Sequence, residues 1–72
     1  MATFERSFLL SHFPGKSDDH ELAAAIGLAE GAIAVVRFQM AAGGEVLFGT
    51  CESRDKINEY LSLGNSTVLW KR

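Results

Sequence analysis

The sequence predicts an α+β domain in which a four-stranded antiparallel sheet carries two helices on one face. Three observations lead to this prediction. Stretches rich in β-branched and aromatic residues alternate with two stretches of helical periodicity. Glycines separate the stretches where a chain would turn. A chain of 72 residues is too short for a second core, so we expect residues 1–72 to form a single domain.

The first predicted element is a strand over Thr3–Phe13. Its residues favour extended backbone, and the apolar run at residues 8–10 is dense enough to use both faces of a sheet. Pro14 and Gly15 end the strand, because proline cannot donate to a sheet and glycine favours a turn.

The second predicted element is a helix over Asp19–Glu30. Asp18 stands three positions before Glu21, which is the spacing of a capping box, and apolar residues follow at helical intervals. Gly31 provides the left-handed residue with which many helices end. This segment therefore predicts an amphipathic helix.

A hairpin is predicted next. The stretches Ile33–Met40 and Glu45–Cys51 are both rich in strand-forming residues, and residues 41–44, Ala-Ala-Gly-Gly, lie between them. A second helix follows, with Ser53 as its N-cap and Gly64 as its stop. Its apolar stripe is formed by Ile57, Tyr60 and Leu61. A last strand over Ser66–Lys71 completes the domain.

The predicted order of strand, helix, strand, strand, helix and strand is that of a ferredoxin-like fold. Right-handed crossovers would then place both helices on one face of the sheet. We expect the spatial strand order 4-1-3-2, with the other face of the sheet open.

With these elements placed, several segments are similar to those of a known family. Residues 8–14, Phe-Leu-Leu-Ser-His-Phe-Pro, resemble its first-strand signature, and residues 18–22 its acidic helix start. Residues 49–55, Gly-Thr-Cys-Glu-Ser-Arg-Asp, match the end of its third strand and the start of its second helix. On these segments the chain resembles the RNA-recognition motif over essentially its whole length, with Leu9 and Val46 at positions where the family has aromatic residues. The resemblance implies a non-canonical module that binds single-stranded RNA, or DNA, on the open sheet face without a cofactor.

Alternation along the strands predicts which side chains would form that binding face. Phe48 would offer its ring for base stacking, and Arg37 and Lys71 would offer donors to phosphate or to base edges. The complete predicted nucleic-acid site is Leu9, Ser11, Arg37, Gln39, Val46, Phe48, Lys71 and Arg72. We expect RNA rather than DNA as the ligand and a monomeric domain in isolation.

Catalytic and metal-binding functions find little support in the sequence. Cys51 has no second cysteine with which to form a disulfide or a zinc site, which indicates a reducing compartment, nuclear or cytoplasmic. In the predicted register His12 lies about 20 Å from Cys51, too far for a thiol and its base. We therefore expect a buried, unreactive thiol, and we predict that the chain is not an enzyme and has no metal site. Trp70 is expected to pack in the core.

Two alternatives remain open. A net charge of −2 is unusual for a domain that binds phosphate without regard to sequence. This charge favours a protein-interaction domain of the same fold, which would dock a peptide or a partner domain. The third interpretation is a small-molecule or metal-carrying ferredoxin-like domain, although the Met-x-Cys-x-x-Cys motif of a copper chaperone is absent. Nothing in the sequence predicts a membrane span or a signal peptide.

Overall fold

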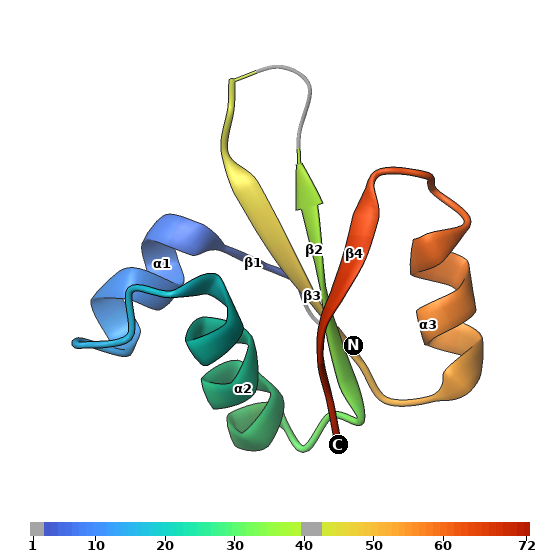
Figure 1. The fold of residues 1–72 in the computed structure, drawn as a ribbon, viewed down its shortest axis with the longest axis horizontal. Coiled ribbons are helices and arrows are strands. Elements are labelled where there is room, and N and C mark those ends of the chain that lie inside the picture. The colour runs from blue at the N-terminus through green and yellow to red at the C-terminus, as the bar shows by residue number, and fades with distance from the viewer. Residues whose placement is uncertain (1–2, 40–42) are drawn as a thin grey trace.

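A computed structural model describes residues 3–39 and 43–72 of the chain. It confirms an α+β fold with a four-stranded antiparallel sheet (Figure 1). Met40, which ends a predicted strand, and Ala41 and Ala42 of the predicted hairpin turn lie outside the described residues. The elements in chain order are β1 (Thr3–Glu5), α1 (Arg6–His12), α2 (Asp19–Glu30), β2 (Ala34–Gln39), β3 (Val46–Cys51), α3 (Arg54–Leu61) and β4 (Ser66–Lys71).

Both predicted helices form where their capping residues indicate. The Asp18 carboxylate accepts hydrogen bonds from the backbone N–H groups of His20 and Glu21, and Gly31 ends α2 in the left-handed conformation at φ 67°. In α3 the Ser53 hydroxyl accepts from the N–H of Lys56. These side-chain caps satisfy donors that the first helical turn leaves without partners.

The predicted strand over Thr3–Phe13 is wrong beyond Glu5, because residues 6–12 form the helix α1. Glu5 gives this helix no side-chain cap. A distant residue does so instead: Glu45, just before β3, accepts hydrogen bonds from both the backbone N–H and the hydroxyl of Ser7, at 3.1 and 3.2 Å. The helix turns Leu9 into the core and leaves Phe8 at the surface.

The strand order is β1-β3-β2-β4, which corrects the predicted order 4-1-3-2. The predicted pairing of β1 with β3 and of β2 with β3 is present. The final strand differs, because β4 pairs with β2 rather than with β1. In the predicted order β1 would lie between β4 and β3 and would pair with both. A strand of three residues offers few backbone groups for a second pairing. The six-residue β2 provides these groups instead.

This order also decides where the helices lie. β1 is parallel to β2, and the chain crosses between them through α1 and α2, while β3 is parallel to β4, and the chain crosses through α3. Both crossovers proceed in the same direction across the sheet, but they start from strands that point in opposite directions. Right-handed crossovers therefore place α1 and α2 on one face and α3 on the other, as Figure 1 shows. The prediction that both helices share one face is wrong, and helices cover both faces.

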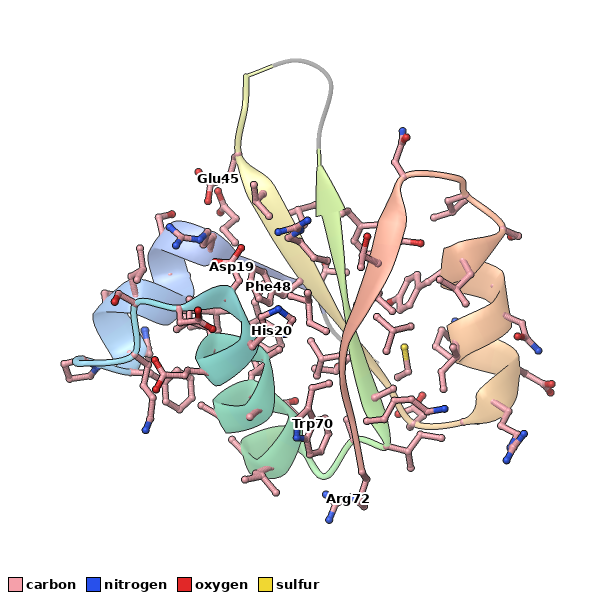
Figure 2. All side chains as sticks on the ribbon, viewed as in Figure 1. Asp19, His20, Glu45, Phe48, Trp70 and Arg72 are labelled. Carbon is pink, nitrogen blue, oxygen red and sulfur yellow. The ribbon has the colours of Figure 1, made fainter. Side chains whose placement is uncertain are left out.

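The first face carries the larger apolar cluster. Phe48 of β3 and Val35 of β2 pack there against Leu22 and Ile26 of α2 and Leu9 of α1. Trp70 joins this cluster from β4, and its ring lies so close to Gly27 that a Cβ atom there would be 2.4 Å away from it. Phe48 and Trp70 thus lie between the sheet and α2 (Figure 2).

The second face carries a smaller cluster beneath α3. Cys51, Ala34 and Val36 contact Tyr60 there, and Phe38 meets the Tyr60 ring edge-on with 4.9 Å between centroids. The prediction that Cys51 is buried is confirmed, since its exposure is 0%. Burial also raises the pKa of its thiol, which disfavours the reactive thiolate.

An irregularity in β4 separates side chains that the sequence placed together. Val36 pairs with Val68 and Val35 pairs with Trp70, so Leu69 is an additional residue on β4. This bulge directs Val68 toward α3 and Trp70 toward α2, although simple alternation would have put both on the same face. The predicted core role of Trp70 is correct, but on the other side of the sheet.

Candidate functional site

The predicted stacking surface lies inside the molecule. Phe48 and Leu9 are both 0% exposed, and Val46 is half-buried against the same cluster. Alternation correctly separated Phe48 from Cys51, but α2 covers the face that was expected to be open. Phe4, rather than Leu9, pairs with Phe48 in the sheet. A nucleobase therefore has no access to the Phe48 ring in this fold.

The predicted polar residues are distributed over separate places. Ser11 is exposed on α1, where its hydroxyl donates to the Phe8 carbonyl. Gln39 is opposite Val46 at the end of β2. Arg37 lies on the same face of the sheet as Phe48, as predicted, but α2 covers this face, and the guanidinium lies 3.2 Å from the Asp19 carboxylate. Ser11 and Arg37 therefore do not form a common binding surface with Lys71.

Asp19 stands at the centre of a small ion-pair network. Its carboxylate accepts from Arg6 Nε of α1 at 2.6 Å and from Arg37 of β2 at 3.2 Å. Partial burial alone would raise the pKa of Asp19, but the hydrogen bonds from Arg6 and Arg37 hold it below its ordinary value of 3.8. Because the network joins α1, α2 and β2, we assign it to the fold.

Lys71 and Arg72, the remaining predicted residues, line a cleft of about 400 Å³ between α3 and the sheet. Half of the described lining residues are aliphatic, and three of the chain's seven Lys and Arg residues also border the cleft. The described residues that line the cleft are Ile33, Arg54, Ile57, Asn58, Leu61, Val68, Lys71 and Arg72.

The three cations of this cleft differ in how firmly they are held. Arg72 is anchored, because its backbone N–H donates to the Ile33 carbonyl at 2.8 Å and its Nε donates to the Ala32 carbonyl at 3.0 Å. Arg54 and Lys71 are exposed and form no ion pair within the described part of the chain. Their charges are therefore available to an anionic ligand at the cleft.

Sequence reasoning missed the contribution of α3 to this cleft. Arg54, Ile57, Asn58 and Leu61 follow one another at intervals of three, one and three residues, which places them along one stripe of a helix. Ile57 and Leu61 were assigned to the core stripe, yet Leu61 is 42% exposed. The spacing was visible in the sequence, but it could not show that the stripe borders Lys71.

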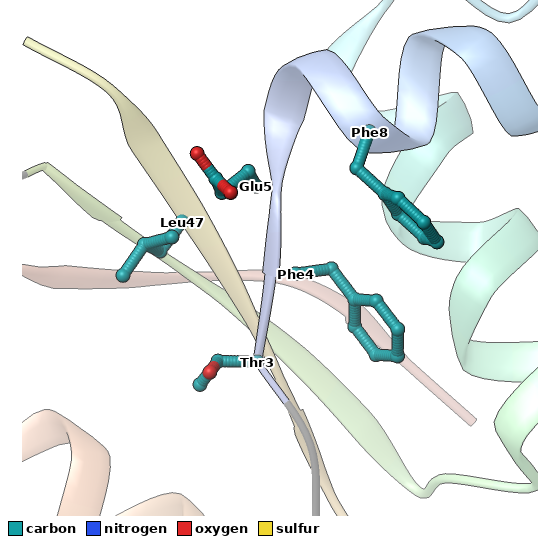
Figure 3. Close-up of a pocket in the computed structure, with 5 residues that line it drawn as sticks. All are labelled: Thr3, Phe4, Glu5, Phe8 and Leu47. Atoms are coloured by element: carbon teal, nitrogen blue, oxygen red, sulfur yellow. The ribbon is translucent and has the colours of Figure 1, made fainter.

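A second hollow of about 520 Å³ lies beside β1 and α1 (Figure 3). It is lined by Thr3, Phe4, Glu5, Phe8 and Leu47. The Phe4 and Phe8 rings stack with centroids 5.7 Å apart. His12 continues this stack on the Phe8 ring at 3.9 Å. Glu5 alone is charged among the described residues that line this hollow, and its negative charge does not suit an anion.

The described residues contain no evident catalytic pair or metal site. His12 lies on α1, on the opposite side of the sheet from Cys51, so the two do not form a catalytic pair. Within residues 3–39 and 43–72 there is no group of three side chains suited to hold a metal ion. None of the described helices is long and apolar enough to cross a membrane.

Comparison with protein-family models, with curated proteins and with solved structures finds no match for this chain. The similarity to the RNA-recognition motif is thus not supported by an independent comparison. Its first-strand segment, residues 8–14, lies largely within a helix.

Proposed function

We propose that this domain is a protein-interaction module that binds an acidic segment of a partner protein in the cleft between α3 and β4. The observation that carries the proposal is the pair of exposed cations, Arg54 and Lys71, at one cleft in a molecule of net charge −2. A local positive surface on an acidic protein attracts anionic ligands selectively, because the rest of the surface repels them.

The aliphatic part of the cleft favours a peptide over a simple anion. Ile57, Leu61 and Val68 offer a surface for methylene or methyl groups, while the cations receive carboxylates. A volume of about 400 Å³ falls within the range of about 300–1,000 Å³ that is usual for binding pockets. Glutamate combines an apolar stem with a carboxylate and matches both parts of this surface.

The same cleft is less suited to nucleic acid. None of the described residues that line it is aromatic, so bases would find no ring among them on which to stack. Phe48, which was expected to provide that ring, is buried. RNA binding remains a prediction that this fold supports only through phosphate contacts.

Binding of a labelled, capped peptide of alternating glutamate and valine, as long as β4, provides the first test. Fluorescence anisotropy should show binding that weakens with added salt, because Arg54 and Lys71 are exposed to solvent. An exposed ion pair contributes about 0.2–1 kcal/mol, so the double change Arg54→Glu and Lys71→Glu should reduce affinity about tenfold or more. Arg72 is left unchanged because it also holds the Ala32 carbonyl.

The matched control is Lys16→Glu, which changes an exposed cation in the loop between α1 and α2 and leaves affinity nearly unchanged. The same peptide with glutamine in place of glutamate should bind poorly. Equal losses for Lys16→Glu and Lys71→Glu would exclude the cleft. Binding of single-stranded RNA with no binding of the acidic peptide would replace the proposed function with the nucleic-acid alternative.

A further inference from the structure

We infer that the acidic peptide binds as an additional β-strand along the outer edge of β4, with alternate side chains directed into the cleft under α3. This inference rests on the proposed function and specifies its binding mode. It concerns the backbone of β4, whereas the proposed function concerns the charges of the cleft.

Among the strands of the described residues, β4 is the last of the sheet and pairs only with β2. Figure 1 shows it between α2 and α3, with its outer side covered by no other labelled element. The strand is six residues long and contains no proline, and its only charge is Lys71 at the end. Such an edge presents N–H and C=O groups to which another strand can pair. The opposite edge strand, β1, has only three residues.

The hydrogen bonds show which backbone groups are available. Arg72 donates its N–H to Ile33 of the β2 side, across the pair Ala34 and Lys71. In an antiparallel ladder, bonds that flank a residue pair in this way leave the pair itself unbonded. The N–H and C=O of Lys71 therefore point away from β2, to the free edge. The Leu69 carbonyl at the bulge is already engaged, since it lies 3.2 Å from His20 Nδ1 of α2, so an added strand would pair at Lys71.

The positive charges of the cleft, and the face of the sheet to which Lys71 points, then indicate that the added strand is acidic. Lys71 is opposite Ala34, whose side chain faces α3, so the Lys71 side chain is on the cleft side of the sheet. A strand paired at Lys71 would direct every second side chain to the same side. Glutamates at those positions would lay their stems on Val68 and Leu61 and carry their carboxylates to Arg54 and Lys71. The intervening valines would face the α2 side.

An N-methylation scan of the glutamate–valine peptide tests this mode on the intact chain. Methylation removes one backbone donor and obstructs close pairing, so a hydrogen bond to the strand is lost wherever the methylated nitrogen faces β4. Methyl groups at alternate peptide nitrogens should therefore weaken binding about tenfold, and those at the nitrogens between them should have little effect. In amide exchange measured by NMR, the Lys71 N–H should become protected when the peptide is added.

The outcomes separate the two proposals. A peptide that binds and depends on Arg54 and Lys71, but shows neither the alternation nor protection of Lys71, would overturn strand addition and leave the proposed function intact. A peptide that does not bind at all would overturn both. Alternation with a period of three to four residues would instead indicate a helical ligand.

Discussion

Phe48 shows how much a single side chain depends on its surroundings. Its alternation along β3 is as predicted, because Cys51 lies in the cluster on the other face and Leu47 pairs with Phe38 of that cluster. The role of Phe48 differs from the predicted one because α2 covers the face on which its ring lies. Phe48 is therefore a core residue with 0% exposure. A residue chosen from the sequence as a stacking platform is thus a contributor to stability.

Replacing Phe48 with alanine should destabilise the domain by about 3–5 kcal/mol, because the change removes a fully buried ring and leaves a cavity. Urea denaturation followed by circular dichroism measures this free energy of unfolding. Phe8→Ala is the matched control. Because Phe8 is 43% exposed, this change should lower the free energy of unfolding much less. A small effect at Phe48 with a large one at Phe8 would show that the faces are assigned incorrectly.

At the scale of elements, Asp19 fixes three of them to one another. It stands at the start of α2 and pairs with Arg6 of α1 and Arg37 of β2. Changing Asp19 to asparagine should therefore lower the free energy of unfolding at neutral pH. Half-exposed ion pairs contribute about 0.2–1 kcal/mol each, so we expect a loss of about 1 kcal/mol.

The pH dependence gives this variant a distinctive signature. The pKa of Asp19 is lower in the folded chain than its ordinary value of 3.8. A lowered pKa means that, as pH falls, the unfolded chain takes up the proton before the folded chain does. The contribution of the Asp19 carboxylate to the free energy of unfolding is therefore complete above its ordinary pKa and is lost as pH falls through its pKa in the folded chain. The difference in stability between wild type and Asp19→Asn should shrink in this acidic range. A difference that is constant between neutral pH and pH 3 would argue against the ion pairs.

The elements also show what the sequence can and cannot predict. Caps and stops at Asp18, Gly31 and Ser53 located two helices, because these signals act within a few residues. α1 was missed because an apolar run of this length fits a strand or a helix equally well, and its cap comes from Glu45, 38 positions along the chain from Ser7. The spacing of Leu9 to Phe13 and of Phe8 to His12 by four residues was the available helical signal.

The residues of the candidate site were also predicted only in part. Lys71 and Arg72 were selected from the sequence and do line the cleft, whereas Arg54 was not. The reason is topological, since the position of α3 depends on whether β4 pairs with β1 or with β2. No local pattern specifies that choice, which depends on the length of β1 and on the crossovers.

At the scale of the whole molecule, two clusters share one sheet, and each contains a natural probe. The only tryptophan, Trp70, packs on the α2 side, and the only cysteine, Cys51, is buried on the α3 side. Because the strands between them belong to both clusters, we expect a single cooperative unfolding transition.

Tryptophan fluorescence and the rate of Cys51 labelling by a thiol reagent, measured across a urea gradient, should therefore give the same midpoint. In the absence of urea the labelling should be far slower than for a free thiol, since Cys51 is buried and its pKa is raised. Cys51 labelling that precedes the change in Trp70 fluorescence would show that α3 opens independently of the sheet.

The placement of α2 and α3 on opposite faces also affects how such a chain can change over generations. Side chains above the sheet contact one another and those below contact one another, while the backbone of the strands lies between the two groups. A substitution at Leu22 can therefore be compensated by a second substitution in the same cluster, such as one at Phe48, and requires no change at Tyr60. A lineage can rebuild the α3 side, with its basic cleft, while the α2 side continues to hold the fold.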